Sequence, residues 1–78
     1  MRYAAVGLMA ETVSEAISVC FQVCPPEGLE ITSDRGGSAE ATIALRYRTP
    51  ADAARVAERA AKRFFNVFHT ANLVTITL

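Results

Sequence analysis

The segment from Thr49 to Phe68 constrains the fold more than any other part of the chain, because its apolar residues recur at helical spacing. Thr49 can accept a hydrogen bond as a helix N-cap, and Pro50 suits the first helical position because it has no N–H to leave unpaired. Asp52 places negative charge in the first turn, as the helix dipole favours. The apolar face consists of Ala53, Val56, Ala57, Ala60, Phe64, Val67 and Phe68. The pattern predicts a helix over 49–68 that packs against a sheet.

Length and composition predict one small domain that spans residues 1–78. The chain has 51% hydrophobic and 21% charged residues, which is the composition of a folded protein. Eight basic and eight acidic side chains give a formal net charge of zero. Proteins that bind nucleic acid or anionic membranes usually carry a basic excess, so this balance argues against both classes.

We expect a cytoplasmic protein without a membrane segment. The apolar run after Arg2 ends at Glu11 and lacks the form of a secretion signal, and no apolar stretch has the length of a membrane span. Cys20 and Cys24 lie four residues apart in an apolar segment, a spacing that gives poor disulfide geometry. We interpret both as reduced core residues.

The first third of the chain allows two interpretations. Residues 2–9 are expected to form either a short strand or the start of a helix; Tyr3 and Val6 favour the strand, and the alanines do not. Residues 12–24 favour a helix, because Thr12 and Glu15 form a capping-box pattern and the polar residues share one side. In the second half of this segment, residues 16–24, the side chains also fit the two-residue alternation of a strand. Pro25 and Pro26 end either element.

The remaining chain predicts a hairpin and a final strand. Residues 29–33 and 39–48 alternate between apolar and polar residues on either side of a loop that contains Gly36 and Gly37. After the long helix, 69–72 is expected to be a connector and 73–78 a strand. The predicted fold class is α+β, a two-layer βαββαβ ferredoxin-like sandwich. The alternatives are αβββαβ, or a β-meander followed by one long helix and a final strand.

We find no pattern that predicts catalysis, a cofactor or a metal site. Gly36 and Gly37 lead into a strand, whereas a phosphate-binding loop leads into a helix. Cys20, Cys24 and His69 are too few for a tetrahedral metal site, and no neighbouring group activates a thiol. We therefore expect a protein that is not an enzyme.

The helix over 49–68 carries the main candidate site, a set of partner-binding residues: Arg55, Arg59, Lys62, Arg63 and Phe65. Arginine and aromatic residues are enriched at binding hot spots. Phe65 lies off the centre of the apolar face, where it can either pack against a loop or serve as an anchor. The basic stripe can also be a solvated polar face, paired in part with Asp52 and Glu58.

A second candidate surface is the uncovered face of the sheet. Arg46 and Arg48 point away from the predicted core, but the strand lacks the aromatic residues of an RNA-recognition motif. The strand over 73–78 has no charged residue or proline to protect it. At a sheet edge it could pair with a second copy and form a homo-oligomer; at the centre of the sheet it needs no protection.

These observations favour a non-enzymatic protein-binding module of inhibitor or adaptor type, with a protein as its partner. Small phage or mobile-element inhibitors, such as anti-CRISPR proteins, share the short, neutral and motif-free character, although no residue match supports this comparison. The alternative is a nucleic-acid-binding domain that uses the arginine-rich helix together with Arg46 and Arg48 on the sheet face.

Overall fold

The protein is an αββαββ chain in a computed structural model that describes the backbone of residues 2–33 and 41–78, and the side chains of 12–32 and 41–78. The elements are α1 (Arg2–Val23), β1 (Gly28–Ser33), β2 (Ala41–Arg46), α2 (Pro50–Ala61), β3 (Asn66–Thr70) and β4 (Leu73–Thr77). Within these ranges, neither helix combines the length and hydropathy needed to cross a bilayer.

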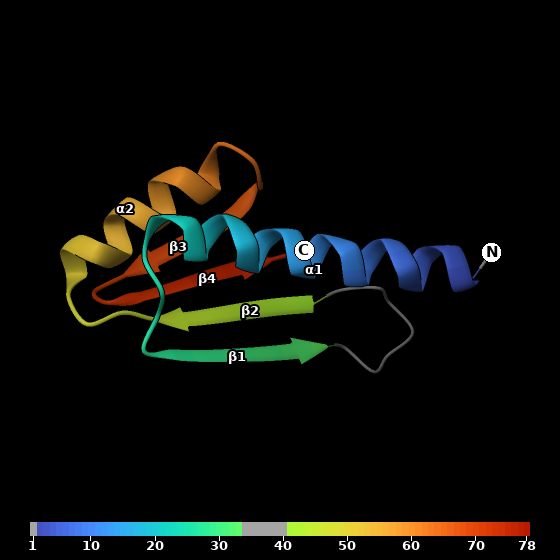
Figure 1. Ribbon diagram of the computed structural model, residues 1–78, viewed down its shortest axis with the longest axis horizontal. Coiled ribbons are helices and arrows are strands. Elements are labelled where there is room, and N and C mark those ends of the chain that lie inside the picture. The colour runs from blue at the N-terminus through green and yellow to red at the C-terminus, as the bar shows by residue number, and fades with distance from the viewer. Residues whose placement is uncertain (1, 34–40) are drawn as a thin grey trace.

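The elements form two layers. One layer is a four-stranded antiparallel sheet in the order β1-β2-β4-β3, and both helices lie on the same face of it (Figure 1). The predicted two-layer α+β class is therefore confirmed, although the order αββαββ differs from the ferredoxin-like βαββαβ. The chain instead consists of two αββ units, α1-β1-β2 and α2-β3-β4. Their second strands, β2 and β4, pair at the centre of the sheet.

The first helix is longer than the sequence predicted. Residues 12–23 are helical as expected, but 2–9 continue the same helix and do not form a strand. The alanine, leucine and methionine residues of 2–10 favour a helix, and this preference outweighs that of Tyr3 and Val6 for a strand. Twenty-two helical residues span about 33 Å, against about 20 Å for a six-residue strand. The first turns of α1 therefore extend past the end of the sheet (Figure 1).

The second helix begins as predicted and ends earlier. The Thr49 hydroxyl accepts a hydrogen bond from the Asp52 amide at 3.2 Å, and Pro50 occupies the first turn. The helix stops at Ala61, and the aromatic and β-branched residues that follow form β3. The prediction of a helix to residue 68 is therefore wrong. The predicted connector over 69–72 is only a two-residue turn, in which Ala71 has a φ of +50°.

The predicted hairpin is confirmed as β1 and β2. The register pairs Leu29 with Leu45 and Ile31 with Ile43, so these four side chains share the helix side of the sheet. The predicted glycine turn at Gly36 lies outside the described residues.

The C-terminal strand is present but lies at the centre of the sheet. β4 pairs with β2 on one side and with β3 on the other, so neither of its edges is open. The proposed homo-oligomer through this strand is therefore wrong. The outer strands of the described sheet are β1 and β3.

The core lies between the helices and the inner strands. α2 contributes small side chains that let it approach β3 and β4 closely, and α1 packs on α2 and β2. The fully buried side chains of largest volume are Tyr47, Ile43, Leu45, Ile76, Val56, Val74 and Cys20. Both cysteines are free thiols, as expected, with Cys20 buried and Cys24 half-buried.

Candidate partner-binding site

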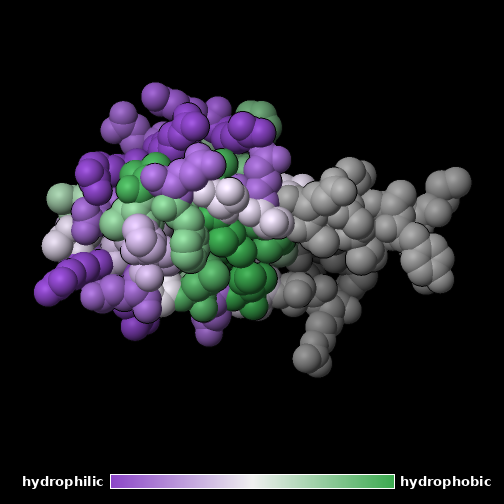
Figure 2. All heavy atoms as spheres, viewed as in Figure 1, coloured by the Kyte–Doolittle hydropathy of each residue, from purple (hydrophilic) through white to green (hydrophobic). Residues whose placement is uncertain are grey.

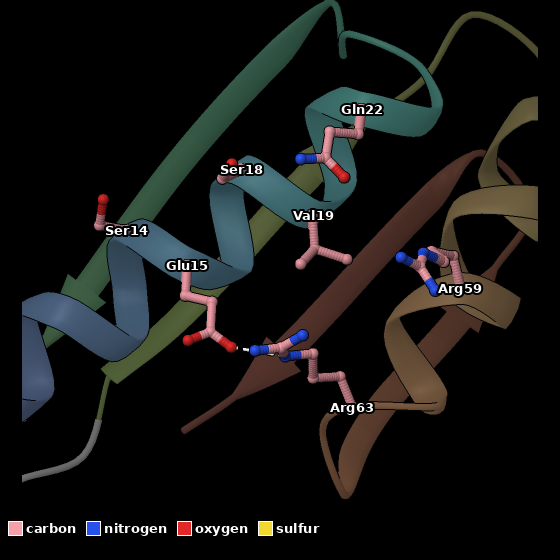
Figure 3. Close-up of a pocket in the computed structure, with 7 residues that line it drawn as sticks. All are labelled: Ser14, Glu15, Ser18, Val19, Gln22, Arg59 and Arg63. Atoms are coloured by element: carbon pink, nitrogen blue, oxygen red, sulfur yellow. Dashed lines mark hydrogen bonds and ion pairs between the residues drawn. The ribbon is translucent and has the colours of Figure 1, made fainter.

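A solvent-open groove of about 470 Å³ separates the two helices on the side away from the sheet (Figure 3). Its lining residues are Ser14, Glu15, Ser18, Val19, Gln22, Arg59 and Arg63. α1 contributes its polar face. Arg59 of α2 and Arg63, in the turn after α2, are two of the arginines singled out in the sequence. The groove is polar apart from one valine, which suits a hydrogen-bonding or charged partner group better than an apolar one.

Arg63 closes one end of this groove by an ion pair with α1. Its Nε lies 2.5 Å from Oε1 of Glu15, and the two side chains are 58% and 45% exposed. An ion pair this exposed to water contributes about 0–1 kcal/mol to stability. The contact nevertheless neutralises Arg63 in part and ties the end of α2 to α1. The sequence analysis did not predict it, because the two residues are 48 positions apart.

Among the described residues of the groove, Arg59 is the cation that no carboxylate compensates. Its side chain is exposed and points toward α1 in Figure 3. No carboxylate of the described residues forms an ion pair with it, in contrast to Arg63. Arg59 is therefore the cation of the groove best placed to meet an acidic group from outside.

The other two basic residues of the helix face lie beside the groove. Arg55 bonds Asp52 one turn earlier, with 3.2 Å between Nη2 and Oδ1. Lys62 is the C-cap residue of α2 and is exposed. With Val23, Glu58 and Arg59, both line a second shallow recess of about 260 Å³. The four predicted cations thus share one surface, but two of them are already paired within the chain.

Phe65 lies outside the helix, on the bend between α2 and β3, and its side chain is fully exposed. The prediction that Phe65 lies on the helix is therefore wrong. Its neighbour Phe64 is half-buried and packs against the core. The Phe64 amide also bonds the carbonyl of Ala60 at 2.9 Å, which holds the chain against the last turn of α2 and leaves Phe65 in water.

The second candidate surface lies on the opposite side of the molecule. Arg46 is exposed on the open face of the sheet, and Arg48 is exposed just beyond β2. Phe68, predicted to be a core residue, is 65% exposed on this open face, because it pairs with Thr75 in β4. The strand alternation of 66–70 could have revealed this. The sheet separates the open face from the helix groove, so the two candidate surfaces are not continuous.

The sequence analysis also missed an apolar strip at the edge of the sheet. Leu29 and Ile31 of β1 are 42% and 48% exposed, whereas their partners Leu45 and Ile43 are completely buried. Phe21 of α1 is exposed as well. In Figure 2 apolar side chains gather between α1 and β1, and hydrophilic ones cover α2. The apolar face of β1 is visible in the sequence. Whether a helix covers that face depends on the topology of the fold, which the sequence does not show.

Two buried polar groups lie in the core, apart from these surfaces. Burial raises the pKa of the Cys20 thiol to about 11, so the thiol stays protonated and unreactive near neutral pH. Burial, and then the neighbouring Cys20 and Cys24, raise the pKa of the Tyr47 hydroxyl. That hydroxyl has no hydrogen-bond partner among the described residues. No cluster of three or more potential metal ligands occurs in the described part of the chain.

A scan against protein-family models found no match to this chain, and searches of the curated proteins and of the solved structures found none either.

Proposed function

We propose that this protein is a non-enzymatic, cytoplasmic protein-binding module of inhibitor or adaptor type. It binds its partner through Phe65 and the basic residues of α2 and of the turn that follows it, namely Arg55, Arg59, Lys62 and Arg63. The observation that carries the proposal is the full exposure of Phe65 four residues after Ala61, where α2 ends beside the groove. Burying a phenylalanine side chain contributes about 1.5–3 kcal/mol, so a partner that covers this ring gains a substantial share of its affinity.

The charges of the surface indicate the chemistry of the partner. Arg59 lacks a carboxylate partner among the described residues, and Lys62 is exposed at the C-cap of α2. An acidic side chain of the partner can pair with Arg59 without breaking an existing ion pair. A partner that binds Arg63 must instead compete with Glu15. We therefore expect an acidic protein surface with an apolar pocket for Phe65.

A tagged pull-down from the native cells, with and without nuclease, tests the proposal. We expect a protein that survives nuclease treatment and is lost when Arg59 and Lys62 are both changed to glutamate. Loss of binding on Phe65→Ala identifies the anchor. Arg46→Glu, on the opposite face, is the matched control and should retain the partner. Circular dichroism must show an unchanged fold for each variant. Binding that survives Arg59→Glu with Lys62→Glu excludes the helix face.

The second candidate function is nucleic-acid binding by the open face of the sheet. Phe68 of β3 and Arg46 of β2 both lie on this face, with β4 between their strands. On one open surface, an aromatic ring can stack on a base while an arginine pairs with the nucleic-acid backbone. A nuclease-sensitive partner whose affinity falls steeply with salt would support this function, because phosphate binding releases counterions. In that case Arg46→Glu should lose the partner and the helix-face variants should keep it.

A further inference from the structure

The α1 wall of the groove between the two helices offers hydrogen-bond donors to a bound group. Ser14, Ser18 and Gln22 follow one another at intervals of four residues, so their side chains form one row along the groove. All three residues are exposed. Serine hydroxyls and the glutamine amide can each donate a hydrogen bond to an oxygen of a ligand. This wall therefore suits a ligand that is rich in acceptors, as a carboxylate is.

The opposite wall presents two guanidinium groups, and one of them already binds a carboxylate. Arg59 and Arg63 are four residues apart, and Glu15 of α1 forms an ion pair with Arg63. One turn further along α1, Val19 takes the position equivalent to Glu15. In Figure 3 the side chains of Val19 and Arg59 point toward each other across the groove. Among the described residues, α1 thus supplies a carboxylate to Arg63 and an aliphatic side chain to Arg59.

We propose that the groove is a carboxylate-binding site for an acidic segment of the partner protein, and that Glu15 competes with this segment for Arg63. The inference rests on the proposed function, because it takes the partner to be an acidic protein. A carboxylate in the groove can accept two parallel hydrogen bonds from Arg59, with Ser18 and Gln22 on the facing wall. A second carboxylate of the segment reaches Arg63 only by displacing Glu15. The charge at position 15 therefore sets the affinity of the site.

The distribution of charge in the groove favours an acidic peptide over nucleic acid. A nucleic-acid backbone carries a continuous row of phosphates and is usually bound by a patch or stripe of several cations. Here Glu15 neutralises Arg63 in part, and Glu58 lines the adjoining recess together with Arg59. The row of positive charge is therefore interrupted on both sides of Arg59. One guanidinium group without a carboxylate partner matches a single carboxylate, which it can bind through both oxygens.

Titration of the full chain with a hexaglutamate peptide, followed by NMR of the arginine side chains, tests the proposal. We expect the Arg59 Nε–H signal to shift at millimolar peptide and the Arg63 signal to shift less. Gln22→Glu keeps the size of the side chain and adds a carboxylate to the groove, so it should weaken peptide binding by about 3-fold. The matched control is Asn66→Asp, the same change of charge on the open face of the sheet, which should leave the affinity unchanged.

A second pair of variants tests the competition by Glu15 and has the opposite sign. Glu15→Gln releases Arg63 and should tighten peptide binding by about 3-fold, with a larger shift of the Arg63 signal. Glu30→Gln, the same change on the open face of the sheet, is the control and should have no effect.

Three results overturn the proposal: no shift of the Arg59 signal with hexaglutamate, a shift that neither groove variant alters, or a shift produced by a single-stranded thymidine oligonucleotide in place of the peptide. If any of these is found while the protein partner from the pull-down still requires Arg59 and Lys62, only the groove inference fails. If the pull-down partner does not require Arg59 and Lys62, the proposed function itself fails.

Discussion

The buried hydroxyl of Tyr47 offers a direct test of the core. Tyr47 is completely buried, and no described residue gives its hydroxyl a hydrogen bond. The backbone of Tyr47, by contrast, is bonded twice to the turn between β3 and β4. Its amide donates to the Asn72 carbonyl at 2.7 Å, and its carbonyl accepts from Asn72 Nδ2 at 2.9 Å. Tyr47→Phe therefore removes the unpaired hydroxyl and leaves the backbone contacts in place.

The magnitude follows from the cost of burying an unpaired polar group, which is about 1–3 kcal/mol. Removing the oxygen leaves a small void, which offsets part of the gain. We expect Tyr47→Phe to raise the free energy of unfolding by about 1 kcal/mol, which corresponds to a rise in Tm of about 4–8 °C for a domain of this size.

Denaturant unfolding at neutral pH, followed by circular dichroism, measures this difference. Asn72→Ala is the comparison variant, because it removes the side-chain bond to the Tyr47 carbonyl and should lower stability by about 1 kcal/mol. If Tyr47→Phe instead lowers stability by a similar amount, the hydroxyl is hydrogen-bonded in solution and the reasoning is refuted.

Three further predictions concern stability. Thr49→Ala removes the N-cap bond to the Asp52 amide and should cost about 1 kcal/mol in denaturant unfolding, whereas Thr49→Ser should cost little. Ala71→Gly should stabilise the protein by about 0.5–1 kcal/mol in the same assay, because Ala71 has a φ of +50° and glycine adopts that conformation without strain; a loss of stability would contradict this. The pKa of Cys20 is raised from 9.0 to about 11, so the stability that this thiol contributes is complete below pH 9 and is lost as pH rises toward 11. Thermal melts over this range should show a shallower decline for Cys20→Ala, and an identical slope would exclude the thiol as its cause.

The sequence predicted those elements whose signals are local. Thr49, Pro50 and Asp52 marked the start of α2 correctly, because a cap involves only neighbouring residues. The end of α2 was not predictable in the same way, since residues 64–68 fit the helical period as well as that of a strand. The strand over 73–77 was found, but its central place depends on pairing with β2, which is distant in sequence.

Some parts of the candidate site could likewise be predicted from local sequence, and other parts could not. The shared surface of Arg55, Arg59 and Lys62 follows from helical periodicity and was predictable. The ion pair of Arg63 with Glu15 joins two helices and could not be inferred from either. The exposure of Phe65 depends on where α2 ends, and the open strip on β1 depends on where α1 lies. Both required the tertiary arrangement.

The division into two αββ units has a consequence for how chains can interlock. The units meet through the β2–β4 pair and the α1–α2 contact, and only residues 47–49 connect them. If this connector extends, α1-β1-β2 of one molecule can dock on α2-β3-β4 of another and recover the β2–β4 and α1–α2 contacts. Such an exchanged dimer needs no new interface, and it forms and separates only by partial unfolding. Slow interconversion between monomer and dimer on dilution would identify it.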